Sequence, residues 1–466
     1  QLKTSAFQSF TARGLAKLCM VCVLLLGLPQ ADARPAQQKP NKPLVSVTKQ
    51  PKKDTVGKKA KNAKSVVDAK AGRLSSSKPS HAPKPTMAPP SVMDKDGLAE
   101  ARLMEIYRLM ANASPKLALV QARQLVTDYP QFQLAQLVYA DLMMGRTRPL
   151  KTLGDAPPDV AQAGMANLQA LRAESQRRVN ALQSRPPTNA VPVQFVGLAK
   201  RNKHAIAVDT DKSRLYLFEN TSSGTRLLAD YYVSVGKAGV GKNVEGDLRT
   251  PLGVYFITSN LNPKILEDLY GTGALPINFP NKLDQRRGKT GSGIWLHGKP
   301  NAQFARAPLA TEGCIALSNP DLDRIIRSVE IQTTPVVIAA KLQWTQPHAA
   351  APQKQQFVQL LRQWADTKQA GTPSSLTRFY ADDFFADGKD LNAFIAAATP
   401  EISRINGRRV EVEDLSLIGW TDTEETMVTT FGELIAGVRG GRTVRQYWQK
   451  RAGTWKIVYE GTSDIG

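Results

Sequence analysis

The spacing of hydrophobic residues divides the chain into regions of different expected structure. Between residues 97 and 145 apolar side chains recur every three or four positions, which is typical of amphipathic helices. The same spacing predicts a helix from Met165 to Leu182, before Arg185 and two prolines interrupt it. We expect residues 97–185 to form an all-α helical module. Its small residues alternating with leucine look tetratricopeptide-like, although one weak match leaves a plain helical packing module as the alternative.

From His204 onward the pattern changes to alternation with a period of two. Short runs rich in β-branched and aromatic residues are separated by Asp, Gly, Asn and Ser, as in antiparallel sheets. The expected strands are 205–209, 215–219, 231–236, 254–257 and 335–339. A helix is expected over 321–329, with Asn319 and Pro320 at its start. Residues 341–352 are predicted to be a linker.

Residues 353–466 are predicted to form a third unit. Helical patterns come first and five β-rich runs follow, which indicates an α+β cone. The stretch from Phe379 to Phe384 and the final Gly453–Ile457 resemble the nuclear-transport-factor-2-like (NTF2-like) fold. Such a cone hosts enzymes or binding pockets, so fold alone assigns no activity. We expect a binding or dimerisation role for this unit. Asp382, Asp383 and Asp387 either line a pocket or are ordinary acidic residues of surface loops.

The N-terminal region has the three-part pattern of a secretory signal. Basic residues precede an apolar run from Leu18 to Leu28, and Ala31-Asp32-Ala33 is a small-residue cleavage site. The run is shorter than the roughly 20 residues that a membrane span needs. We therefore predict a signal peptide over 1–33 and a protein that is exported to the periplasm and is not transmembrane after signal removal.

Half of the formal net charge of +22 belongs to one segment. Residues 34–96 hold 15 Lys and Arg against 4 Asp and Glu, with many Pro, Ser and Ala. Such a composition cannot bury enough apolar surface to fold, so we expect a disordered basic tether. Export removes nucleic acid as a partner. Lipid headgroups and cell-wall polymers remain as polyanions, and a purely solvated spacer is the alternative.

The candidate chemistry centres on Cys314, the last of three cysteines. The other two lie in the predicted signal peptide, so the mature chain has one thiol. A thiol needs a nearby base to act as a nucleophile, since its ordinary pKa is about 8.5. His297, seventeen residues upstream at the end of an expected strand, is the candidate base. The backbone N–H groups of Gly313 and Cys314 are candidate oxyanion donors. The alternative is a buried Cys and a buried His that never meet.

Three motifs in this region resemble those of the L,D-transpeptidase (YkuD-type) catalytic domain. They are Gly246-Asp247-Leu248-Arg249-Thr250-Pro251-Leu252-Gly253, Trp295-Leu296-His297-Gly298 and Thr311-Glu312-Gly313-Cys314-Ile315. The resemblance covers residues 203–340 and implies a β-rich domain flanked by the helical module and the cone. It also implies that Cys314 forms a thioester with peptidoglycan stem peptides while His297 moves the proton. No cofactor or metal is expected, and the flanking modules are candidates for binding envelope proteins.

The resemblance leaves the acceptor of the acyl group open. Many members have His in place of Glu312 and Arg in place of Ala316. The variant found here resembles a subgroup that includes a hydrolase releasing protein from peptidoglycan. An amine acceptor gives a cross-link or protein attachment, and water gives cleavage. A non-catalytic envelope scaffold is the third alternative.

Overall fold

The structure is a computed structural model that describes residues 97–405 and 407–465. The predicted signal peptide and basic tether lie outside these residues. Within them, no helix is both long enough and apolar enough to cross a bilayer.

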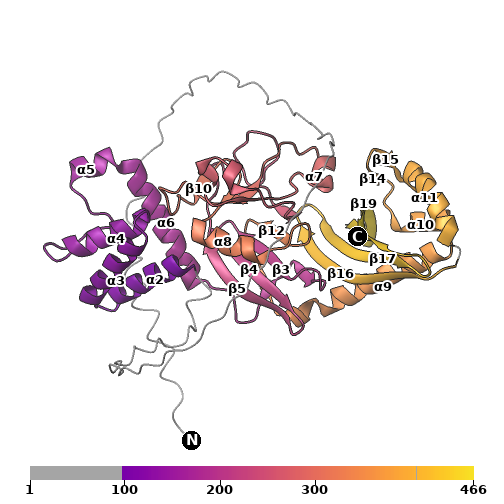
Figure 1. Cartoon of the computed structure of the whole chain (residues 1–466), viewed down its shortest axis with the longest axis horizontal. Helices are drawn as coiled ribbons and strands as arrows, with labels where there is room; N and C mark the ends of the chain where they lie inside the picture. Colours follow the sequence, from indigo (N-terminus) through magenta and orange to yellow (C-terminus); the bar gives the residue numbers. More distant parts are fainter. Residues whose placement is uncertain (1–96, 406, 466) are drawn as a thin grey trace, which may run out of the picture. The chain divides into compact units, whose positions relative to one another are not determined.

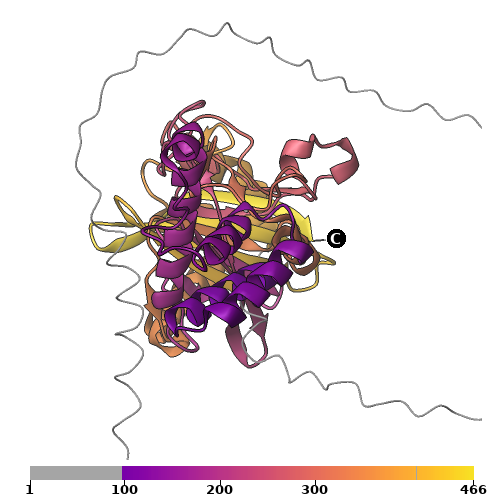
Figure 2. The ribbon, with the colours of Figure 1, turned by 90° about the vertical axis from the view of Figure 1, so that its left-hand side faces the viewer.

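Residues 98–183 fold into five helices, as the spacing of apolar residues indicated for four of them. They are α2 (Leu98–Ala111), α3 (Pro115–Asp128), α4 (Gln133–Met144), α5 (Pro158–Ala163) and α6 (Met165–Gln183). Their apolar faces form one buried cluster that includes Leu103, Ile106, Leu125 and Val138. Figure 2 shows the indigo and purple helices of this module, of which α2 and α3 pack side by side. The structure does not distinguish a tetratricopeptide hairpin from another helical packing module.

The middle of the chain is built on a five-stranded sheet with the order β5-β4-β3-β12-β7. The strands are β3 (His204–Asp209), β4 (Arg214–Thr221), β5 (Gly224–Tyr232), β7 (Gly253–Phe256) and β12 (Pro335–Ala339) (Figure 1). The expectation of a purely antiparallel sheet is wrong, because β12 runs parallel to β3. The chain makes a long crossover through α8 (Asn319–Ser328) before β12, and such a crossover is what parallel pairing requires.

Both faces of this central sheet are buried. Ile206, Val208 and Leu217 face one apolar cluster, which also contains Leu322 and Ile325 of α8. Side chains that alternate with them along the strands, such as Ala205, Ala207 and Phe218, face a second cluster shared with the C-terminal strands. Strands buried on both faces explain why these runs are apolar at nearly every position.

Smaller sheets lie beside the central one. Strands β8 (Ala274–Pro276), β9 (Trp295–His297) and β11 (Ile315–Ala316) form a sheet with the order β11-β9-β8. Strand β6 (Val235–Gly236) pairs in parallel with β10 (Leu309–Thr311). Three short helices complete the region: η1 (Pro263–Ile265), η2 (Asp268–Tyr270) and α7 (Lys282–Arg286).

The C-terminal unit is α+β, as predicted. Its helices and short strands are α9 (Ala351–Gln369), α10 (Pro373–Leu376), η4 (Thr377–Phe379), β14 (Phe385–Ala386), β15 (Lys389–Asp390) and α11 (Leu391–Ile405). The long strands are β16 (Val410–Thr421), β17 (Glu425–Ile435), β18 (Gly441–Arg451) and β19 (Thr454–Ile465). They form a meander, and Trp364 and Trp448 lie in the cluster that this sheet shares with the helices (Figure 1).

Segments outside the predicted domain boundaries also take part in the fold. Strand β2 (Phe195–Gly197) pairs with β16 and so becomes the fifth strand of the C-terminal sheet. Within the predicted linker, β13 (Trp344–Thr345) pairs with β1 (Val191–Pro192), and η3 (Pro347–Ala350) follows. The segments before and after the central sheet therefore tie it to the C-terminal unit.

Candidate active site

The backbone around Cys314 requires glycine at the preceding position. Gly313 has φ +128°, and a Cβ there would lie 2.7 Å from the carbonyl oxygen of Arg249. The Thr250 hydroxyl donates to the Gly313 carbonyl at 2.8 Å, and the Thr311 hydroxyl donates to the Cys314 carbonyl at 2.7 Å. The loop that presents the sulfur is thus fixed by two buried hydroxyls and by the absence of a side chain at Gly313.

His297 ends β9 and its side chain is buried. Its Nδ1 lies 2.7 Å from the Gly298 carbonyl oxygen. Because a carbonyl can only accept, Nδ1 carries the proton and Nε2 keeps a lone pair. Burial lowers the pKa of His297 to about 4, and the positive charges of Lys299 and Arg306 act in the same direction. The imidazole is therefore neutral at pH 7 and able to accept a proton at Nε2.

Strand pairing brings the segment that carries Cys314 beside the strand that ends at His297. Strands β9 and β11 are parallel, with Ala316 paired to His297. Cys314 lies directly before β11, in the loop that enters this strand. The Tyr270 ring lies 5.3 Å from the His297 ring, and the pKa of Tyr270 is raised by burial and by the nearby Cys314. Tyr270 is therefore close to both the imidazole and the thiol.

The thiol is in a resting arrangement. Cys314 Sγ donates to the Gly293 carbonyl at 3.3 Å, and no hydrogen bond joins it to the imidazole in the part of the chain that the structure describes. Burial raises the pKa of Cys314, and the Trp295 backbone amide partly offsets this. A neutral thiol beside a neutral imidazole must transfer its proton as it attacks, rather than beforehand.

Asn319 holds the backbone just after the histidine, a role that the sequence analysis missed. Its Oδ1 accepts from the Lys299 amide at 2.9 Å, and its Nδ2 donates to the Lys299 carbonyl at 3.0 Å. A Cβ at Gly298 would lie 2.2 Å from the same Oδ1. Because Gly298 has no side chain, it leaves room for the Asn319 amide. The asparagine fixes the segment whose carbonyl orients His297.

Two polar residues close to the motifs are buried. Lys299 is 0% exposed, and burial holds its pKa well below the usual range. Tyr255 is also 0% exposed and donates to the Leu252 carbonyl at 3.0 Å. These two side chains therefore do not face a substrate. Arg249 is exposed and donates to the Val240 carbonyl at 2.9 Å.

One protein-family model matches the region that contains Cys314 and His297. Residues 203–338 match the model of the YkuD family, the L,D-transpeptidase catalytic domain. This stretch is the YkuD region of the chain. It contains the three motifs, both faces of the central sheet and the Cys314–His297 pair. No curated protein sequence matches the chain.

Solved structures extend the comparison beyond the YkuD region. Bdellovibrio bacteriovorus Bd1075 is similar with a TM-score of 0.51 and 22% identity, over 59% of this chain and 99% of that chain. This likeness shows a shared fold. Pgp2 from Campylobacter jejuni, a helical cell shape determining protein, matches at 0.48 and 22% identity, over 63% and 99%. An NTF2-like protein from Pseudomonas putida matches at 0.21 and 14% identity, over 24% and 87%. The last two TM-scores are too low to show a shared fold, so the NTF2-like assignment of 353–466 stays a prediction.

The helical module contacts the connection between the two candidate catalytic residues of the YkuD region. Phe304, between β9 and β10, is buried in the apolar cluster of the helices. Its ring stacks on Phe132 at 4.2 Å and meets Tyr129 edge-on at 5.6 Å. The Tyr232 hydroxyl donates to the Arg306 carbonyl at 2.8 Å. The loop from His297 to Cys314 is therefore held from outside the YkuD region by Phe132 and Tyr129, and from within it by Tyr232.

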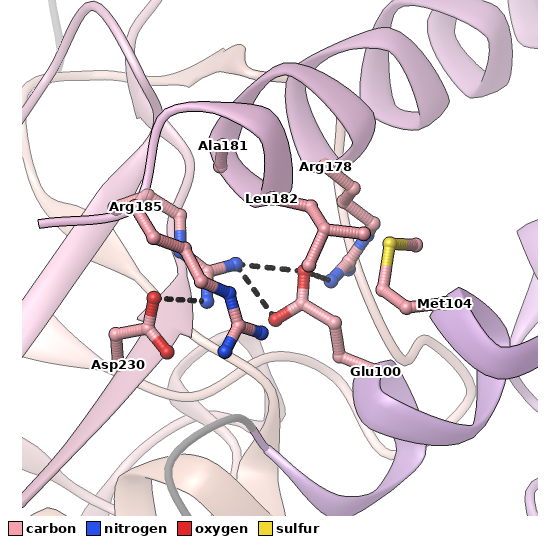
Figure 3. A pocket seen from close by; sticks show the side chains of 8 residues that line it. Glu100, Met104, Arg178, Ala181, Leu182, Arg185 and Asp230 are labelled. Atoms are coloured by element: carbon pink, nitrogen blue, oxygen red, sulfur yellow. Dashed lines mark hydrogen bonds and ion pairs between the residues drawn. The ribbon is translucent and has the colours of Figure 1, made fainter. Parts of the chain in front are cut away.

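A buried charge cluster joins the same two parts. Glu100 of α2 pairs with Arg178 of α6 and with Arg214 of β4, each at 2.7 Å. Arg214 also pairs with Asp230 of β5 at 2.9 Å, and Arg178 pairs with Glu174 at 2.7 Å. Figure 3 shows Glu100 pointing toward Arg178, with Asp230 on the far side of the cluster. Burial raises the pKa of Glu100, but the two guanidinium groups lower it more, to about 2. Glu100 is therefore an ionised link between the helices and the central sheet.

Proposed function

We propose that the protein is a cysteine-dependent L,D-transpeptidase that acts on peptidoglycan stem peptides in the periplasm. One observation supports the proposal most: within the YkuD region, the Cys314 loop enters the strand that pairs with β9, which ends at the neutral His297, and Tyr270 lies near both side chains. The predicted signal peptide supports export. The expected intermediate is a thioester between Cys314 and the donor peptide.

The first half-reaction follows from the protonation states. Cys314 gives its proton to Nε2 of His297 while the sulfur attacks the carbonyl carbon that precedes a terminal D-amino acid. The C–N bond then breaks, and the imidazolium returns the proton to the departing amine. The Gly298 carbonyl keeps the imidazole oriented and stabilises the transient cation. Before attack, Sγ must turn away from the Gly293 carbonyl.

The oxyanion donors need a rearrangement on one side. The Gly313 amide donates to Thr311 Oγ1 at 3.2 Å in the resting arrangement. If that amide is to stabilise the tetrahedral oxyanion, it must exchange the hydroxyl for the substrate oxygen. The Cys314 amide is the second proposed donor. Substrate binding would therefore free the Gly313 amide and complete the pair of oxyanion donors.

Mass spectrometry of the intact protein tests the proposal. Wild type is incubated with a disaccharide tetrapeptide, and the mass of a Cys314 thioester and of the products is followed. Cys314→Ala removes the nucleophile and is the matched control. Product masses with and without an added amine separate cross-linking or attachment from hydrolysis. An absent thioester, no product, and no acylation by a carbapenem would favour the non-catalytic scaffold.

A further inference from the structure

A cavity lies between the central sheet and the C-terminal sheet, apart from the candidate active site. Its volume is about 460 Å³, which is within the range of roughly 300–1,000 Å³ typical of ligand sites. Phe256 at the end of β7 lines one side, and Arg445 and Tyr459 of β18 and β19 line the other. None of the residues that line it belongs to the Cys314–His297 site.

Arg445 is a cation without an anionic partner in this cavity. Its Nε donates to Thr430 Oγ1 at 3.0 Å, and its guanidinium carbon lies 3.5 Å from the centre of the Phe256 ring. Burial lowers the pKa of Arg445, and the positive Arg201 acts in the same direction. Among the side chains that the structure describes, which end at Thr462, no carboxylate forms an ion pair with it. A half-buried guanidinium without a counter-charge is unfavourable, so the cavity favours an anion.

The other two cations of the cavity are already neutralised. Arg201 pairs with Asp414 at 2.6 Å, and Lys282 pairs with Asp387 at 3.2 Å. The donors that remain at Arg445 form a planar fork that matches a carboxylate in a bidentate manner. The cavity therefore suits a ligand with one anionic group beside Arg445, rather than a polyanion with many charges.

The rest of the lining is neutral and hydrogen-bonding. Thr258, Thr333, Thr443 and Thr462 offer hydroxyls, and Asn278 and Gln332 offer amides. Thr333 Oγ1 is buried and has no hydrogen-bond partner. Buried polar atoms are nearly always paired, so this hydroxyl is an unsatisfied group at the cavity wall, which a ligand reaches when the side chain turns toward it. Hydroxyl and amide groups beside a single cation suit a ligand with hydroxyls, amides and one carboxylate.

We propose that this cavity binds an acidic, N-acetylated sugar of a glycan strand. Arg445 pairs with the sugar carboxylate, and Thr333 bonds to a hydroxyl or amide of the same unit. Only the source of the sugar, the glycan of the peptidoglycan whose peptides reach Cys314, rests on the proposed function. The site would hold the polymer while the YkuD region acts on its peptides.

Calorimetric titration of the full chain carrying Cys314→Ala tests the site without turnover. The probe is a peptide-free disaccharide that ends in N-acetylmuramic acid. The matched ligand is N,N′-diacetylchitobiose, which has the same N-acetylated units but lacks the carboxylate. Arg445→Met keeps an unbranched side chain over Phe256, and we expect it to weaken binding of the acidic disaccharide about tenfold or more. Neutral chitobiose should bind weakly and equally to both proteins.

A second variant guards against misfolding of the first. Thr333→Val removes the unpartnered hydroxyl at nearly constant shape, so the melting temperature should not fall while acidic-disaccharide affinity falls several-fold. Arg409→Met, at a side chain that is 76% exposed, is the charge control and should leave affinity unchanged.

Equal binding of the two disaccharides, or unchanged affinity in Arg445→Met and Thr333→Val, would overturn the proposal. So would a sugar-free stem peptide whose binding depends on Arg445 while the disaccharide does not bind. Loss of acylation at Cys314 with intact disaccharide binding would refute the proposed function alone. Intact acylation without this binding would refute the glycan site alone.

Discussion

Replacing Glu100 by glutamine tests the charge cluster between the helices and the central sheet. The change removes the carboxylate from between Arg178 and Arg214, which keep Glu174 and Asp230 as their other carboxylate partners. The pKa of Glu100 is about 2 against an ordinary 4.5. Since one pKa unit corresponds to about 1.4 kcal/mol, ionised Glu100 contributes about 3 kcal/mol at neutral pH. Breaking a buried pair by removing one partner costs a similar roughly 3–5 kcal/mol.

Hydrogen exchange of α2 and α6 amides, read by mass spectrometry, measures this loss locally. At pH 7 we expect exchange in Glu100→Gln to be faster by about a hundredfold. The folded pKa is depressed, so the stabilisation is present above about pH 4.5 and disappears as the pH falls toward 2. The difference in exchange rate between wild type and variant should therefore become smaller as the pH falls from about 4.5 to about 2.

Glu105 provides the matched control on the same helix. It pairs with Arg108 at 2.6 Å on the surface, and Glu105→Gln should leave exchange unchanged because exposed pairs contribute little. Unchanged α2 and α6 exchange in Glu100→Gln, or an identical increase at pH 7 and pH 2, would refute the reasoning.

Four further predictions concern the candidate site. Phe304→Ala should destabilise the packing of the helices on the YkuD region by about 3–5 kcal/mol, measured by urea titration, and should lower the rate of acylation; unchanged stability would show that the Phe132 stack is not formed. Gly313→Ala should abolish acylation because its Cβ meets the Arg249 carbonyl, whereas Gly239→Ala, also at positive φ but with open space around it, should retain activity. The acid limb of kcat/KM should lie near pH 4, the pKa of His297, rather than near 6.5, and the same depressed pKa should cost stability as the pH falls from 6.5 to 4; a limb at 6.5 would contradict the burial of the imidazole. Asn319→Ala should lower kcat more than it changes KM, because it frees the backbone that orients His297; a pure KM effect would indicate a substrate contact instead.

Local patterns in the sequence predicted most helices and strands but not how the strands pair. Helices α2, α3, α4 and α6 follow the spacing of apolar residues. Helix α11, which was missed, contains Pro400, a residue type that usually ends or kinks a helix. Strand β2 joins a sheet formed more than 200 residues later, and no local pattern can indicate such a partner.

The candidate site shows the same division between local and long-range information. The local motifs predicted Cys314 and His297 as candidates, and the β9–β11 pairing brings the two segments that carry them side by side. The contacts of Asn319 and Phe304 were missed because both depend on segments that meet only in the folded chain. The requirement for glycine at position 298 was the one local signal of a close neighbour. Ala316, where the resemblance led us to expect Arg, is 0% exposed, and a guanidinium there would have to be accommodated by moving its neighbours.

The double-sided burial of the central sheet limits how the protein can be dissected. Cutting the chain after β13 would expose Ala205, Ala207 and Phe218 to water, together with the rest of the face that now packs on β16–β19. A shortened protein of this kind would expose a large apolar surface and self-associate. Its inactivity would therefore say nothing about catalysis. Single substitutions within the intact polypeptide are the cleaner way to separate what each segment contributes.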